Sequence, residues 1–179
     1  MKKVLLGTVL MCLLNSSSVF AGVSKEINIK GHQVVYSASN DNQVKDIRVN
    51  TYATIDFQDG YKTYCYLRFD LTSIENSCGL LPKTGIYVDD SEKPLQLTAY
   101  SISENTTKNK NGSPKYSSHI YYETKSDREL KKIASAKKVT VCFIFRERAP
   151  IEWQIQEDLL MEWKEIFSKD KDAELKKID

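Results

Sequence analysis

The chain has 179 residues, of which 26 are basic and 24 acidic, and its formal net charge is +2. This length suits a single domain that buries a sizeable core. The nearly balanced charge gives no support for nucleic acid as a partner, because phosphate binding requires a strongly basic surface.

The first 21 residues have the pattern of a cleavable secretory signal. Lys2 and Lys3 supply its positive charge, and residues 4–14 form an apolar stretch. That stretch is too short to cross a hydrocarbon core, which takes roughly 20 residues. Residues 19–21 (Val-Phe-Ala) then offer small or modest side chains at the positions that a signal peptidase reads, so cleavage is expected after Ala21.

Cleavage would release a periplasmic or fully secreted protein without a membrane anchor. Residues 22–179 contain 24 basic and 24 acidic side chains, because the signal holds two lysines and no acids. This even balance again argues against a nucleic-acid partner. We expect residues 22–179 to form one α+β domain, with a charged tail that frays after residue 169.

The clearest pattern in the sequence is a long hairpin. Apolar and polar residues alternate from Ile47 to Phe57, which is the period of a strand. The alternation resumes from Tyr61 to Phe69, after a loop with the Asp59-Gly60 pair that favours positive φ. Two antiparallel strands are therefore expected, with odd positions on an apolar face and even positions on the opposite face.

Shorter strand patterns lie on both sides of this hairpin. They cover residues 27–37 with a break near Gly31, and residues 85–88, 95–103, 117–124 and 139–145. The last pattern is apolar on both faces, which favours a central position in the sheet. Residues 104–116 are rich in Asn, Lys and Thr and show no apolar periodicity, so we expect an exposed, mobile loop there.

Two helices are expected late in the chain. Ser126 and Glu129 form a capping box for a short helix that ends before Lys138. Apolar residues recur at helical spacing from Gln156 to Ser168, which predicts an amphipathic C-terminal helix. The predicted fold class is α+β: a curved antiparallel sheet with the short helix and the C-terminal amphipathic helix packed on it. A sandwich, a half-barrel and an open sheet all fit these patterns.

Three cysteines remain after removal of the signal: Cys65, Cys78 and Cys142. One disulfide is expected in an oxidising compartment, and one thiol is then left over. A Cys65–Cys78 bond would hold the loop after the hairpin against it, whereas a Cys65–Cys142 bond would join the hairpin to a late strand. The spacing does not rank the three possible pairings.

The sequence carries no motif for catalysis, metal binding or cofactor binding. Only His32 and His119 could act as a general base, and no nucleophile motif accompanies either. The seven glycines lack phosphate-loop spacing, and a zinc site has too few ligands. Four acids fall near predicted strand ends, where turn residues are common and a carboxylate pair or calcium site is the alternative: Asp56, Asp70, Asp89 and Asp90. We expect no catalytic residue, no metal and no cofactor.

The even face of the predicted hairpin combines tyrosines with basic side chains. Tyrosine and arginine anchor protein interfaces, because each offers a large, stiff contact area with a polar tip. A glycan or a single strand could also stack on such rings, and a cross-strand aromatic cluster without a binding role is the structural alternative. The candidate binding residues are Arg48, Tyr52, Lys62, Tyr64, Tyr66 and Arg68.

These patterns favour a small exported binding protein without catalysis. We expect it to recognise another protein, as an inhibitor, a toxin-neutralising protein or an accessory subunit. One alternative is a small secreted hydrolase or toxin that uses a histidine with a strand-end acid. Another is an adhesin or pilus-type structural subunit. The sequence does not fix the oligomeric state.

Overall fold

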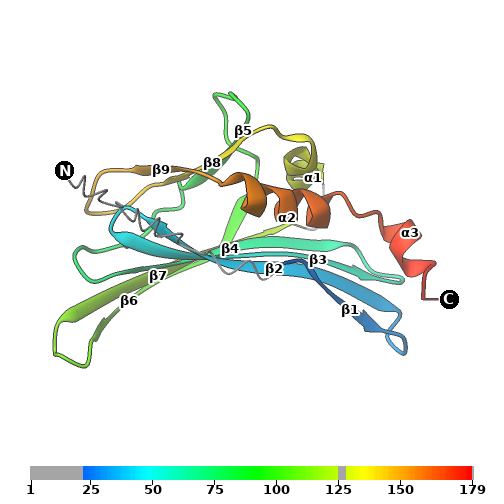
Figure 1. The fold of residues 1–179 in the computed structure, drawn as a ribbon, viewed down its shortest axis with the longest axis horizontal. Helices are drawn as coiled ribbons and strands as arrows, with labels where there is room; N and C mark the ends of the chain where they lie inside the picture. Colours follow the sequence, from blue (N-terminus) through cyan, green and yellow to red (C-terminus); the bar gives the residue numbers. More distant parts are fainter. Residues whose placement is uncertain (1–21, 125–127, 179) are drawn as a thin grey trace, which may run out of the picture.

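Figure 1 shows the computed structural model, which describes residues 22–124 and 128–178. These residues form two antiparallel sheets and three short helices, so the expected α+β class is confirmed. The predicted signal peptide, residues 1–21, lies outside the described residues. The larger sheet has six strands, in the spatial order β1 (Ser24–Asn28), β2 (Gln33–Val44), β3 (Ile47–Gln58), β4 (Tyr64–Ser73), β7 (Pro114–Thr124) and β6 (Thr98–Lys108).

A second layer covers one face of this six-stranded sheet, which we call the covered face (Figure 1). α2 contacts both β2 and β3. The hairpins at the two edges bend away from the second layer, so the sheet is curved, and it is not closed into a barrel. The second layer consists of α1 (Arg128–Ser135), α2 (Glu157–Phe167) and a three-stranded sheet of β5 (Gly85–Val88), β8 (Val139–Phe143) and β9 (Ile151–Gln154).

The predicted hairpin is the β3–β4 pair. The two strands are antiparallel, from Arg48 opposite Thr72 to Asp56 opposite Tyr64. Gly60 has a φ of 70° in the connecting turn, as the Asp-Gly pair predicts. The alternation was wrong at Tyr61 and Thr63, which precede β4 and are not buried. It is confirmed within the two strands, where these odd positions are buried on the covered face: Ile47, Val49, Thr51, Ala53, Ile55, Phe57, Cys65, Leu67, Phe69 and Leu71.

Phe69 of β4 lies where the two layers meet. Its ring makes edge contacts with Tyr122 of β7, Phe143 of β8 and Trp163 of α2, at centroid distances of 6.4, 5.7 and 6.0 Å. All four side chains are buried. Aromatic side chains bury a large apolar area and gain further from edge-to-face geometry. Phe69 therefore joins both sheets and α2 in one core.

Residues 104–116 do not form the expected mobile loop. β6 runs on to Lys108, β7 begins at Pro114, and the two strands pair throughout this region. Residues 103–108 are exposed on both faces, so they carry no apolar period to reveal the strand. Backbone hydrogen bonds to β7 hold this edge strand instead.

β8 is the central strand of the smaller sheet, between β5 and β9. The prediction that this strand is central is confirmed, but the prediction that both of its faces are buried is wrong. Val139, Val141 and Phe143 are buried, whereas Thr140 and Cys142 are only half-buried. The outer face of the smaller sheet has no further layer over it within the described residues, which explains the difference (Figure 1).

The predicted C-terminal helix is α2, whose caps are Gln156 and Ser168. Its predicted apolar stripe is buried against the sheet. The short helix α1 is also present from Arg128, but Ser126 of its expected capping box lies outside the described residues. None of the helices in the described part of the chain has both the length and the apolar character that a membrane crossing requires.

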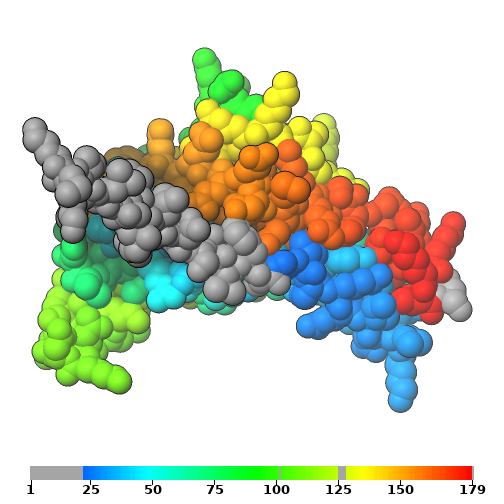
Figure 2. Space-filling view, in the orientation of Figure 1, coloured from blue at the N-terminus to red at the C-terminus, as the bar shows by residue number. Residues whose placement is uncertain are grey.

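Residues 170–178 do not form the expected frayed tail. They form a third short helix, α3 (Lys171–Leu175), in which the Asp170 carboxylate caps the N-terminus by accepting from the Ala173 N–H at 3.0 Å. Leu175 is buried, and α3 contacts β2 and β3. Figure 2 shows this red segment packed against the blue N-terminal strands.

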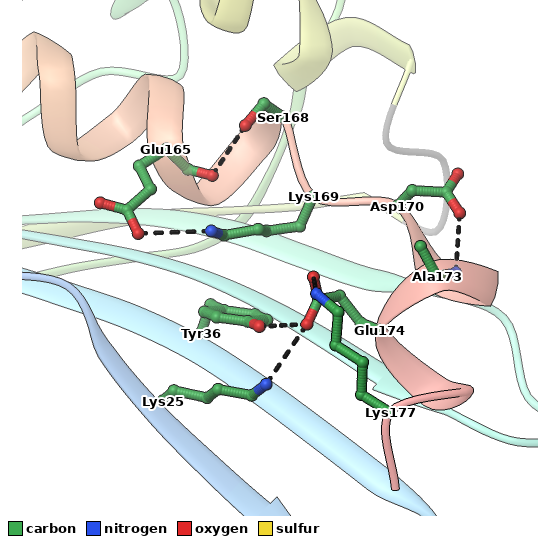
Figure 3. A network of polar contacts seen from close by, with 9 residues as sticks. All are labelled: Lys25, Tyr36, Glu165, Ser168, Lys169, Asp170, Ala173, Glu174 and Lys177. Carbon is green, nitrogen blue, oxygen red and sulfur yellow. Dashed lines mark hydrogen bonds and ion pairs between the residues drawn. The ribbon is translucent and has the colours of Figure 1, made fainter. Parts of the chain in front are cut away.

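A buried carboxylate holds α3 in place. Glu174 is 5% exposed and accepts hydrogen bonds from the Tyr36 hydroxyl of β2, from Lys177 Nζ at 2.6 Å and from Lys25 Nζ of β1 at 3.3 Å (Figure 3). Burial alone would raise its pKa, but the bonds from Lys177, Tyr36 and Lys25 together lower it to about 2. The carboxylate therefore ties both ends of the described chain to the edge of the sheet.

Candidate binding face

The opposite face of the six-stranded sheet, which we call the open face, has no layer packed on it within the described residues (Figure 1). Five of the six candidate binding residues lie on it, at alternate positions of β3 and β4. Lys62 does not, because β4 begins only at Tyr64 and Lys62 lies in the preceding turn. The five residues on the open face are Arg48, Tyr52, Tyr64, Tyr66 and Arg68.

The two arginines of the open face are paired within the sheet. Arg48 Nε donates to the Asp41 carboxylate of β2 at 2.8 Å, and this contact lowers the pKa of Asp41. Arg68 donates from Nε and Nη2 to the two oxygens of Asp70, each at 2.7 Å. The Arg68 guanidinium also lies 5.2 Å from the Tyr52 ring centroid, within cation–π range. These contacts hold both side chains against the sheet and neutralise their charge locally.

A row of three tyrosine rings crosses the open face from β4 to β6. Tyr66 stacks on Tyr121 of β7 with ring centroids 5.1 Å apart, and Tyr121 lies 5.7 Å from Tyr100 of β6. Burial is the main cause that raises the pKa of Tyr121, and its electrostatic interactions with Tyr66 and Glu123 raise it further. The phenol therefore stays neutral at physiological pH. Each ring is braced by its neighbour, which makes the row a preorganised contact surface.

Tyr100 joins this row because β6 contains a bulge. Ala99 pairs with Tyr122 and Ser101 pairs with Tyr121, so Tyr100 is an extra residue between two successive rungs. A bulge breaks the strand period and redirects the side chain of the inserted residue. It leaves Tyr100 72% exposed beside Tyr121.

Two hollows lie on the open face. One has a volume of about 400 Å³ and is lined by Tyr64, Thr98, Tyr100 and Glu123; we call it the tyrosine pocket. The other has a volume of about 370 Å³ and lies toward β1, with Ser37, Tyr52 and Tyr66 among its lining residues. The tyrosine row therefore contributes one ring to each hollow, Tyr100 to the first and Tyr66 to the second.

The histidines do not form a catalytic arrangement. His32 lies in the β1–β2 turn with a φ of 46°, and its Nδ1 is 3.7 Å from Asp59 Oδ2. His119 lies on the open face, in register with both Ser103 and Asp70, and its Nδ1 is 2.9 Å from Ser103 Oγ. In a Ser-His-Asp triad the acid holds the second ring nitrogen, but here the Asp70 carboxylate is bound to Arg68.

The four acids proposed as a possible carboxylate or calcium site do not gather at one place, although Asp89 and Asp90 are neighbours. Asp56 accepts from Gln33 Nε2, and Asp70 is bound to Arg68. Asp89 accepts from the backbone N–H groups of Lys137 and Lys138, and Asp90 lies near the Lys138 ammonium. Within the described residues, no three His, Cys, Asp or Glu side chains gather as they would around a metal ion.

The expected disulfide is not found, since none joins Cys65, Cys78 and Cys142 in the described part of the chain. Cys78 Sγ donates to the Leu71 carbonyl at 3.8 Å. Leu71 lies at the far end of β4 from Cys65, about 20 Å away at the usual rise, whereas a disulfide needs Cα atoms within about 7 Å. Cys142 lies on the outer face of β8. Partial burial is the larger cause that raises the pKa of its thiol, and the negative charge of Glu152 raises it further.

Sequence reasoning missed three residues of the open face: Tyr100, Tyr121 and Glu123. The alternation of β7 could have revealed Tyr121 and Glu123, because they occupy the odd positions, and the even positions Ser118, Ile120 and Tyr122 are buried. Tyr100 had no such signal, since the bulge breaks the period. Comparison with protein-family models, with curated proteins and with solved structures finds no match to this chain.

Proposed function

We propose that the chain is an exported, non-catalytic binding protein that recognises another protein through its open face. The observation that carries this proposal is the braced tyrosine row on a sheet face that no other described layer covers. Tyrosine is enriched in the centres of protein interfaces, where it contributes large contact area at a small entropic cost.

The charges of the open face support a protein partner over a nucleic acid. Arg48 and Arg68 are already neutralised by Asp41 and Asp70, so they offer little free positive charge to a phosphate backbone. Arg68 lies in register between Tyr52 and Tyr121, so its paired charge is part of the aromatic patch, and arginine is enriched with tyrosine in protein interfaces.

A hydrolase is the second candidate, because His119 lies against the Ser103 hydroxyl. The occupied Asp70 carboxylate does not favour it, and neither does the position of the pair on two hydrogen-bonded strands. Replacing His119 and His32 by Ala tests this candidate. Loss of the biological effect with an unchanged melting temperature would favour the hydrolase.

The double substitution of Tyr64→Ser and Tyr66→Ser tests the proposal. The purified exported protein and its variant are used as bait in a periplasmic extract, and any retained protein is purified and its affinity measured directly. We expect a stoichiometric partner whose binding the double variant loses. Its melting temperature should fall by only a few degrees, because a lost ring pair costs about 1 kcal/mol.

Tyr61→Ser is the matched control. Tyr61 is 60% exposed and lies in the β3–β4 turn, away from the tyrosine row, so this variant should keep the partner. A large loss of stability in the double variant would instead assign the tyrosines a structural role. Sedimentation of the purified protein as polymers would favour the structural subunit over a soluble binding protein.

A further inference from the structure

The tyrosine pocket combines exposed aromatic rings with a carboxylate. Tyr64 begins β4, Thr98 begins β6 and Glu123 is near the end of β7, so the antiparallel order brings all three to the same end of the sheet. Tyr64 is 38% exposed and Tyr100 is 72% exposed. Both rings therefore present surface to a ligand rather than to the core.

The Tyr100 ring of the pocket is held in position before any ligand arrives. The β6 bulge places Tyr100 beside Tyr121, and Tyr121 is stacked on Tyr66. Support of this kind lowers the ordering cost that a ligand must otherwise overcome. Bulges are frequent beside binding sites because they redirect single side chains in this way.

Glu123 differs from three other acids of the open face, because each of those is bound by another side chain. Asp41 is paired with Arg48, Asp70 with Arg68, and Asp56 accepts from the Gln33 amide at 3.0 Å. Glu123 is half-buried, and among the described residues no hydrogen bond or ion pair is made to its side-chain carboxylate. A carboxylate that is partly removed from water and lacks a cation attracts one more strongly than an exposed carboxylate does.

We propose that the tyrosine pocket receives a lysine or arginine side chain of the protein partner, with Glu123 as its counter-ion. This inference rests on the proposed function, because the cation comes from the surface of that partner. Tyrosine ring faces attract ammonium and guanidinium groups through their quadrupole, and the carboxylate adds an opposite charge. An anionic ligand would be repelled by the same carboxylate. A volume of about 400 Å³ holds one long side chain.

The test uses capped amino acids as probes, so it needs no knowledge of the partner. N-acetyl-lysine methylamide, its arginine counterpart and the uncharged norleucine counterpart are titrated into the exported protein. Binding is followed by NMR through the ring signals of Tyr64 and Tyr100. We expect both cationic probes to shift these signals with a dissociation constant on the order of 1–10 mM, and norleucine to leave them unchanged.

Two pocket variants and two controls locate the effect. Glu123→Gln keeps the shape and removes the charge, so it should weaken the cationic probes by about threefold to tenfold. Tyr100→Leu keeps bulk but removes the ring, and it should weaken them at least as much. Glu26→Gln on β1 and Tyr61→Leu in the β3–β4 turn lie outside the pocket and should change neither titration.

Three results would each overturn the cation site: equal binding of the norleucine probe, unchanged affinity of the cationic probes in Glu123→Gln, or unshifted ring signals of Tyr64 and Tyr100 at a probe concentration of about 10 mM. These outcomes separate the two proposals. If the probes fail while the bait experiment yields a partner that the tyrosine variants lose, only the cation site is wrong. If the probes bind as expected but no partner depends on the open face, the pocket takes cations and the proposed protein partner is wrong.

Discussion

The two faces of the six-stranded sheet share one backbone and differ in almost everything else. In β4, Leu67 and Phe69 point into the core, while Tyr66 and Arg68, which alternate with them, point away from it. The covered face meets helices and a second sheet, and the open face meets only its own neighbours within the described residues. Successive residues of one strand thus point to opposite faces, one that stabilises the fold and one that we propose binds a partner.

Substitutions at two adjacent residues of β4, Phe69 on the covered face and Arg68 on the open face, should show the largest difference in stability between the two faces. Phe69→Ala should cost about 3–5 kcal/mol in the free energy of unfolding, because it removes a buried ring that touches both layers. Arg68→Ala should cost no more than about 1 kcal/mol, because its contacts with Asp70 and Tyr52 are partly exposed. Urea unfolding of both variants measures the difference. Similar losses would mean that the open face stabilises the fold as much as the covered face.

The covered face also carries a charged contact at the edge where α3 docks. Glu174→Gln should cost about 1–3 kcal/mol at pH 7, because Lys25, Lys177 and Tyr36 lose a charged acceptor. The pKa of Glu174 is about 2 in the folded protein, below the ordinary value of 4.5, so its contribution is complete above pH 4.5 and is lost as the pH falls toward 2. Urea unfolding at several pH values should show the wild type and the variant converging in acid.

Glu165→Gln is the control for this pH dependence. Glu165 is 54% exposed and pairs with Lys169 at 3.3 Å (Figure 3), so its loss should change stability by less than about 1 kcal/mol. A Glu174→Gln variant as stable as the wild type at pH 7 would show that α3 docks without help from the carboxylate. Equal effects at positions 165 and 174 would show that burial of Glu174 adds nothing.

Sequence patterns predicted the parts of this fold in which one face is buried and the other is not. β3, β4 and α2 each alternate between core and solvent, and their faces were correctly predicted. The pattern fails where that contrast is missing. The outer part of β6 is exposed on both faces, and α3 buries mainly one leucine and one carboxylate. Such elements are held by backbone pairing and by specific polar contacts, which leave no period in the sequence.

The contrast between a buried and an exposed face of each strand also determines how much of the candidate site could be predicted from the sequence. Tyr64, Tyr66 and Arg68 follow from the alternation of β4, because their neighbours are apolar. The stacking partner of Tyr66 depends on which strand lies beside β4, and β7 is separated from it in the chain by β5 and β6. Strand order is set by tertiary packing, so no local pattern brings Tyr121 and Tyr100 to the same place.

The smallest effect concerns a polar group on the covered face. Thr51 is 1% exposed, and its hydroxyl has no hydrogen-bond partner among the described residues. Desolvating a hydroxyl without a partner opposes folding, so Thr51→Val should raise the free energy of unfolding by about 1 kcal/mol. Thr72→Val on the open face is the control, and it should change stability by less than about 0.5 kcal/mol because Thr72 is only half-buried. A destabilised Thr51→Val variant in urea unfolding would mean that the hydroxyl is satisfied, and the covered face would then tolerate a polar group in its centre as well as at its edge.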